Sequence, residues 1–205
     1  VTLVCAVDMP QHLRYLSGWD RVVKEIPRNT DMSIVVDSST ETLFEYYERN
    51  GMLSWLKTKP FVVIDHHTET DGLSYASLSY IEEAVATSEI IHRIALILNW
   101  PLPLDACEMM SVSIMSDSLG LTTEASTPAS YRVMADLIER GVSIPKLEQA
   151  RRELMRKEPE LIAYKGRLLE RVTFDESGRI ASVIIPWDEI ERYSPLYNPS
   201  MLIMD

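Results

Sequence analysis

The stretch Phe61-Val62-Val63-Ile64-Asp65-His66-His67 decides the fold, because a short apolar run ends in a carboxylate followed by two histidines. Such a β-branched run is typical of a strand buried on both faces. Met32–Asp37 repeats the pattern upstream, and Val1–Val7 is a third run of this kind. Thr40–Lys57, between two of these runs, has helical spacing. A strand, a helix and a strand at this spacing predict a right-handed βαβ unit, and therefore an α/β fold with a parallel sheet flanked by helices.

The rest of the chain changes from a helical to a strand pattern. Apolar spacing predicts four further helices: Ile81–Asn99, Leu104–Ser118, Pro128–Arg140 and Ile144–Leu161 or beyond, the last broken or bent at Pro159. The following pattern predicts strands at Leu168–Phe174 and Ile180–Ile185, then one short helix at Trp187–Tyr193. We therefore expect a smaller α+β domain to begin near Gly166.

Composition excludes several classes of protein. The 205 residues include 20 Lys and Arg against 31 Asp and Glu, a net charge of −11. This balance argues against a protein that coats DNA through its phosphates. No apolar run approaches the roughly 20 residues that span a bilayer. Cys5 and Cys107 are too few for a disulfide framework, which fits a reducing cytoplasm.

Carboxylates and histidines cluster where the predicted strands end. Asp37 and the Asp65-His66-His67 group follow two parallel strands, so we expect them at one edge of the sheet, where ligands gather. Asp117 lies in an apolar helical stretch, where a carboxylate is costly unless it is paired or bound to a cation. Each residue alone has an ordinary alternative: Asp37 as a turn or cap residue, and the histidines as surface residues. Together they indicate a site for Mn²⁺ or a similar ion.

Three motifs in order resemble one known family. Val63-Ile64-Asp65-His66-His67 resembles the signature of the DHH phosphoesterase superfamily, and the surrounding chain is similar to its bifunctional oligoribonuclease/pAp phosphatase (nanoRNase) branch. Ala86–Ile91 resembles the helix that follows the histidine motif in that branch. Ser116-Asp117-Ser118, together with Thr122–Pro128, resembles its fourth motif. The resemblance runs from about Val1 to Ile190.

The resemblance implies a role for each candidate residue. Asp37 would bridge two metal ions, and His66 and Asp117 would complete the ligand shell of the second. His67 would bind and stabilise the substrate phosphate, and Asp65 would orient a histidine by a hydrogen bond; these two are the catalytic candidates. The implied cofactor is Mn²⁺, two ions in the intact protein, with Mg²⁺ or Co²⁺ as alternatives. A water molecule activated by the two metals would attack the phosphate.

The resemblance also implies that the sequence is a fragment. The family's first motif, one His and two Asp, would precede Val1, and most of the C-terminal domain would follow Asp205. We therefore expect a DHH domain at 1–148, a helical connector at 149–166 and an incomplete C-terminal domain at 167–205, inactive or nearly so by itself. Ser118-Leu119-Gly120 places a glycine one position later than the branch usually has it.

The expected function is hydrolysis of short nucleotides. The substrates would be short oligonucleotides, dinucleotides or 3′-phosphoadenosine 5′-phosphate, and no long nucleic acid or membrane partner is expected. Two alternatives stay open: a pyrophosphatase or exopolyphosphatase that cleaves phosphoanhydrides, and a non-catalytic relative that binds nucleotides. The expected location is the cytoplasm, and a homodimer is compatible with these expectations.

Overall fold

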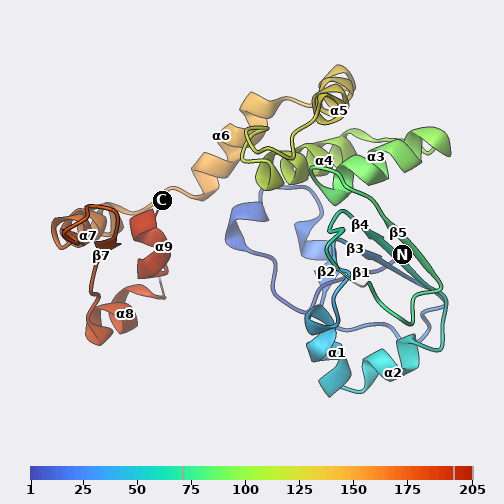
Figure 1. Cartoon of the computed structure of the whole chain (residues 1–205), viewed down its shortest axis with the longest axis horizontal. Helices are drawn as coiled ribbons and strands as arrows, with labels where there is room; N and C mark the ends of the chain where they lie inside the picture. Colours follow the sequence, from blue (N-terminus) through green and yellow to red (C-terminus); the bar gives the residue numbers. More distant parts are fainter. Residues whose placement is uncertain (71, 196, 205) are drawn as a thin grey trace. The chain divides into compact units, whose positions relative to one another are not determined.

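The computed structural model describes residues 1–70, 72–195 and 197–204, and it divides into two compact units, Val1–Leu154 and Met155–Asp205. Each unit is described by itself. The first has an α/β architecture, with parallel strands flanked by helices, as the sequence predicted (Figure 1). Among the described residues, none of the helices has both the length and the apolarity needed to cross a membrane.

Two parallel sheets form the strand layer of the first unit. Its strands are β1 (Leu3–Val4), β2 (Val22–Val23), β3 (Ser33–Val36), β4 (Phe61–Asp65) and β5 (Leu78–Ile81). β1 pairs with β2, and β3, β4 and β5 form a separate sheet in that order. Val36 is in register with Ile64, so the residues that follow β3 meet the end of β4. This register brings the two predicted halves of the site to one edge of the sheet.

Two groups of helices pack around the strands. The α-helices of this unit are α1 (Glu45–Arg49), α2 (Met52–Leu56), α3 (Thr87–Ile97), α4 (Leu104–Asp117), α5 (Pro128–Glu139) and α6 (Ile144–Leu154); the 3-10 helices are η1 (Gln11–Leu13), η2 (Trp19–Arg21) and η3 (Glu41–Phe44). Side chains of α1 and α2 bury Phe61 and Val63 of β4 in one core. A second core joins α4 and α5 to the segment that precedes α3. In Figure 1 the strands lie between α1 and α2 below and α3–α5 above.

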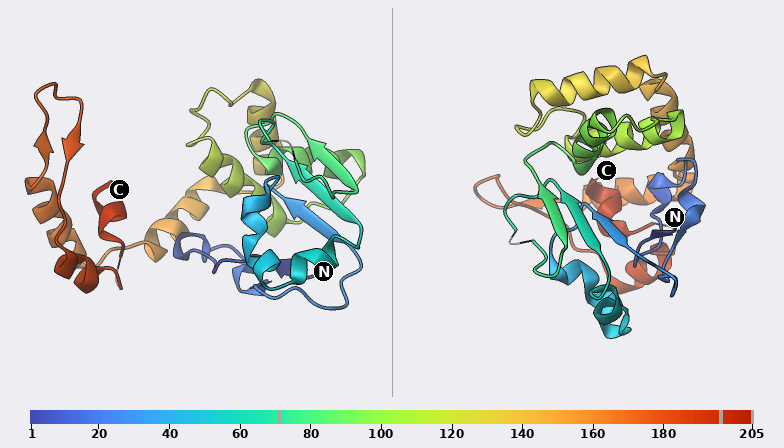
Figure 2. Two further views of the ribbon diagram at one scale, coloured as in Figure 1. Left: turned by 60° about the horizontal axis from the view of Figure 1, so that its bottom comes forward. Right: turned by 90° about the vertical axis from the view of Figure 1, so that its right-hand side faces the viewer.

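The second unit is a small α+β structure with its own core. It contains α7 (Pro159–Glu170), β6 (Thr173–Phe174), β7 (Ala181–Ser182), α8 (Trp187–Tyr193) and α9 (Pro199–Met204). β6 and β7 form an antiparallel hairpin, visible in orange in the left view of Figure 2. Tyr164 and Tyr193 stack with ring centroids 3.8 Å apart inside the core. The predicted domain ranges 1–148, 149–166 and 167–205 stay a prediction; Gly166 lies within α7.

Several predicted elements differ from the observed ones. Only Leu3–Val4 of the Val1–Val7 run is a strand, and it is not buried on both faces. β3 likewise alternates half-buried and exposed residues, because it lies at the edge of the three-stranded sheet among the described residues. The predicted Thr40–Lys57 helix is divided into η3, α1 and α2, with Gly51 in the left-handed region at φ 66°.

The start of the predicted Ile81–Asn99 helix was also wrong. Leu78–Ile81 is instead the strand β5, because its backbone pairs with β4, and α3 begins only at Thr87. The predicted Leu168–Phe174 strand was wrong over its first residues, since Leu168 packs into the core from α7 and the strand begins at Thr173. Of Ile180–Ile185, only Ala181–Ser182 is a strand. The helix predicted at Trp187–Tyr193 is confirmed.

Candidate metal centre

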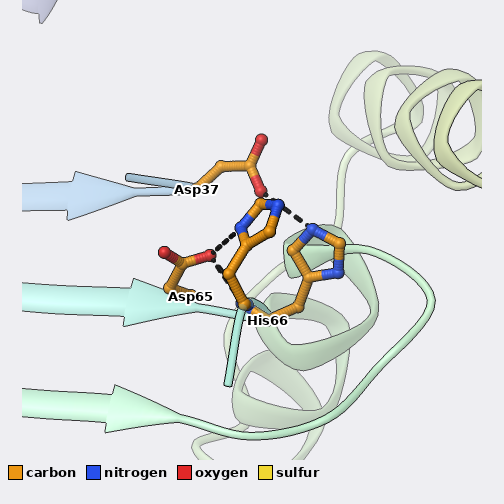
Figure 3. Close-up of side chains that lie close together, drawn as sticks. Asp37, Asp65 and His66 are labelled. Carbon is orange, nitrogen blue, oxygen red and sulfur yellow. Dashed lines mark hydrogen bonds and ion pairs between the residues drawn. The ribbon is translucent and has the colours of Figure 1, made fainter. Parts of the chain in front are cut away.

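Two carboxylates follow neighbouring parallel strands. Asp37 comes directly after β3, and its backbone N–H donates to the carbonyl of Ile64 at 3.0 Å; Asp65 ends β4 (Figure 3). Asp37 has a φ of 59°, in the left-handed region that non-glycine residues seldom occupy, although Asp tolerates it better than most. Unfavourable backbone conformations of this kind are concentrated at functional sites. The turn after β3 therefore fixes the point from which the Asp37 side chain extends.

His66 has a defined proton arrangement. Its Nδ1 lies 3.0 Å from the carbonyl oxygen of Ala84. A carbonyl can only accept, so Nδ1 carries the proton and, in the neutral ring, Nε2 carries a lone pair. That Nε2 lies 3.4 Å from Asp37 Oδ1. Two acceptors facing each other at this distance repel unless the ring gains a proton or a cation binds between them.

Asp65 is a fully buried carboxylate that organises the backbone and the ring next to it. Its Oδ1 accepts from His67 Nδ1 at 2.7 Å, and from the backbone N–H groups of His66 and His67 at 2.7 and 3.2 Å. Burial acts to raise the pKa of Asp65, but the influence of the Ser39 hydroxyl and of His67 outweighs it, so that the pKa is lowered. The Ser39 hydroxyl also hydrogen-bonds to the Thr70 hydroxyl at 2.6 Å, and Asp65 Oδ2 is buried with no geometric hydrogen-bond partner among the described residues.

His67 is the more exposed of the two histidines. Its hydrogen bond to Asp65 raises its pKa; partial burial opposes this, and the charges of Asp65, Asp37 and Asp117 add to it. Because Nδ1 is engaged by Asp65, Nε2 is the ring nitrogen left to meet a ligand. A ring held in this way, with its proton affinity raised, is suited to donate a hydrogen bond to an anion.

Asp117 is the last residue of α4 and lies within electrostatic reach of Asp37, His66 and His67. Its pKa is raised, first by burial and then by the charge of Asp37, while the two histidines act to lower it. A helix C-terminus carries a partial negative charge, which further disfavours a carboxylate there. The position therefore favours a cation nearby, although Asp117 is not one of the residues whose ligand atoms lie closest together.

Four side chains of the site could act as metal ligands together: Asp37, Asp65, His66 and His67. Each offers one ligand atom, and these four atoms all lie within 4.8 Å of one another. Ligands on opposite sides of a single ion are about 4 Å apart, so a small contraction would let the group hold one. Mixed carboxylate and imidazole ligands suit Mn²⁺, Zn²⁺ and related ions. The donor set therefore fits a divalent metal of this type.

Sequence reasoning missed the residues that hold these side chains in place. The Thr87 hydroxyl donates to Asp37 Oδ1 at 2.8 Å, and the Ala84 carbonyl binds His66 as described above. Thr87 lies in a stretch that resembles a family motif, but only the packing of α3 against the strand ends places its hydroxyl beside Asp37. A carbonyl group leaves no side-chain signal at all.

Comparisons with known proteins support the fold. No protein-family model matches the chain. An uncharacterized protein of Mycoplasma pneumoniae is 29% identical over 93 residues, which is 45% of this chain and 28% of that protein. The crystal structure of an exopolyphosphatase-related protein from Bacteroides fragilis matches with a TM-score of 0.79 at 13% identity, over 95% of this chain and 58% of the other. The chain thus shares that fold and spans less than two thirds of either protein.

Proposed function

We propose that this chain carries part of the active site of a metal-dependent hydrolase that cleaves phosphate ester or anhydride bonds in small substrates. The observation that carries the proposal is the pair formed by Asp37 and His66. The proton on His66 Nδ1 is fixed by a carbonyl, so the lone pair of Nε2 is directed at a carboxylate 3.4 Å away. This arrangement is typical of metal ligands whose orientation is set by a second hydrogen bond.

The other residues would divide the remaining tasks. Asp37, His66 and Asp117 would hold the metal, with Mn²⁺ the ion we favour. When bound, a divalent ion of this kind lowers the pKa of water and offsets the negative charge of a phosphate group. Asp65 would fix the ring of His67 through Nδ1, and the raised pKa of His67 would help it to donate from Nε2 to a phosphate oxygen.

Short nucleotides are the substrate class we favour. The resemblance of Val63–His67 and of the stretch around Asp117 to DHH phosphoesterases of the nanoRNase branch supports this choice. The net charge of −11 also favours short substrates over a long nucleic acid, which needs a basic channel. The second candidate is a phosphoanhydride hydrolase, favoured by the name of the exopolyphosphatase-related structural neighbour. A homodimer and a cytoplasmic location stay predictions.

Metal binding is the first test. We expect the chain to bind Mn²⁺ in a calorimetric titration and Asp37→Ala to weaken that binding at least tenfold. Asp31→Ala removes another exposed carboxylate, six residues earlier, and should leave the affinity unchanged. Equal affinity in all three proteins, or no binding in any of them, would contradict the proposed centre.

The second test is the substrate preference of the protein, measured on the product of its gene. With Mn²⁺ present, we expect it to release mononucleotides from a dinucleotide, and phosphate from 3′-phosphoadenosine 5′-phosphate, faster than phosphate from pyrophosphate or polyphosphate. The reverse order would favour the phosphoanhydride candidate. Binding of nucleotides with no turnover of any substrate would instead favour a non-catalytic relative.

A further inference from the structure

One hydroxyl group contacts the proposed centre without being one of its ligands. Thr87 is the first residue of α3 and is buried, with 4% of its surface exposed. Its Oγ1 donates to Asp37 Oδ1 at 2.8 Å, across 50 residues of sequence. A buried hydroxyl directed at a carboxylate is a charge-assisted hydrogen bond, which is stronger than one between neutral groups.

Asp37 needs such a partner more than Asp65, the carboxylate at the end of the neighbouring strand. Its side chain is 52% exposed, whereas that of Asp65 is fully buried. An exposed carboxylate next to a fixed backbone can still rotate, and ordering it costs entropy. Thr87 has a β-branched side chain with restricted rotation, on the first turn of a helix. Its hydroxyl therefore offers Oδ1 a fixed donor and leaves Oδ2 without a bond to Thr87.

The same short segment also orients the second proposed ligand. Ala84 lies three residues before Thr87, and its carbonyl accepts from His66 Nδ1 at 3.0 Å. Residues 84–87 thus contact Asp37 on one side and His66 on the other. Since Asp37 Oδ1 lies 3.4 Å from His66 Nε2, movement of this segment would change the spacing between these two atoms.

We propose that Thr87 is a positioning residue, which sets the orientation of Asp37 and thereby its spacing from His66. The inference rests on the proposed function in so far as these two residues hold a metal. Partners that orient metal ligands in this way are typically worth a factor of 10 to 100 in metal affinity.

The chain offers matched variants for the test. Thr87→Val keeps the branched shape and removes the hydroxyl, and Thr87→Ser keeps the hydroxyl and removes the methyl group. Ser88→Ala removes the hydroxyl of the next residue, which is also buried but donates to Ser113 at 2.9 Å and not to the site. In calorimetric titration with Mn²⁺ we expect Thr87→Val to bind at least tenfold more weakly, and Thr87→Ser and Ser88→Ala to stay within about threefold of the wild type.

A second readout does not depend on metal. In the metal-free chain, nitrogen NMR of the imidazole rings should show a shift of His66 Nε2 in Thr87→Val and no such shift in Thr87→Ser or Ser88→Ala. An unchanged His66 signal in Thr87→Val, or an equal change in all three variants, would overturn the positioning role. If Thr87→Val fails to fold, Thr87→Ala takes its place in both experiments. If the wild type binds no Mn²⁺, the proposed function fails, and the NMR comparison still decides the role of Thr87.

Discussion

At the scale of single residues, the buried carboxylate of Asp65 raises the pKa of His67. The ring donates to this carboxylate at 2.7 Å, and this bond is the largest cause of its raised pKa. Asp65→Asn keeps an oxygen that can accept the same hydrogen bond but removes the negative charge. We therefore expect the pKa of His67 to fall in this variant, as measured by NMR titration of the metal-free chain. The signal of His12 provides an internal reference. An unchanged pKa of His67 would contradict the proposal that the Asp65 carboxylate raises it.

The hydrogen-bonded pair of Asp65 and His67 should stabilise the fold only within a window of pH. The pKa of Asp65 is lowered from 3.8, so its contribution is complete above that value and is lost as the pH falls through the folded-state pKa. The pKa of His67 is raised from 6.5, so its contribution is complete below that value and is lost as the pH rises through the folded-state pKa. In EDTA, the difference in the free energy of unfolding between wild type and Asp65→Asn should be largest between about pH 4 and 6.5.

The sequence could predict that these residues meet, but not how they meet. Asp37 and Asp65 each follow a predicted strand, and parallel strands bring their carboxyl ends to one edge of a sheet. Which histidine contacts Asp65 depends on the turn after β4, where both backbone N–H groups also bind this carboxylate. The donor to Asp37 comes from Thr87, 50 residues away, and such a pairing requires the tertiary structure.

At the scale of secondary structure, Gly51 explains why one predicted helix is divided. It lies between α1 and α2 with a φ of 66°, which L-residues with a side chain rarely adopt. An added Cβ would meet no atom within 4 Å, so the strain of Gly51→Ala comes from the backbone alone. We expect this variant to lower the free energy of unfolding of the first unit by about 1 kcal/mol, measured by hydrogen exchange of its amides.

Gly166 is the matched control for this prediction. It lies within α7, has no positive φ, and likewise has open space around the position of a Cβ. Alanine is favoured over glycine inside a helix, so Gly166→Ala should stabilise the second unit by about 0.5–1 kcal/mol. The same substitution is thus expected to have opposite signs at the two positions. If both substitutions change the free energy of unfolding in the same direction, the left-handed backbone conformation of Gly51 does not determine the effect of Gly51→Ala.

Helices with a proline at or just before their first residue were predicted best, and short strands worst. α4 and α5 begin at the predicted residues Leu104 and Pro128, and Pro at the start of a helix is a local signal. β5 was not predicted, since Leu78–Ile81 is short and becomes a strand through its pairing with β4. Long-range pairing of this kind is not encoded in the local pattern of four residues.

At the scale of the whole molecule, the two units have separate cores. The described residues proposed for the site all belong to Val1–Leu154. The core of Met155–Asp205 contains Tyr164 and the fully buried Leu168, while that of α4 and α5 contains the fully buried Leu137. The sequence predicted a change of structure type after the fourth helix, but the position of the division depends on which side chains pack together. A substitution that destabilises the core of one unit should therefore lower the stability of that unit and leave the other largely unchanged.

Leu168→Ala tests this independence. Removing a fully buried leucine side chain from a core typically costs about 2–5 kcal/mol, so amide protection should fall across residues 155–204. Because the residues of the proposed centre belong to the other unit, we expect amide protection in residues 1–154 and the affinity for Mn²⁺ to stay at their wild-type values. Leu137→Ala makes the same change in the first unit and should reverse the pattern, with loss of protection in 1–154. If Leu168→Ala lowers protection in both units, their folding is coupled and the division into two units does not describe their stability.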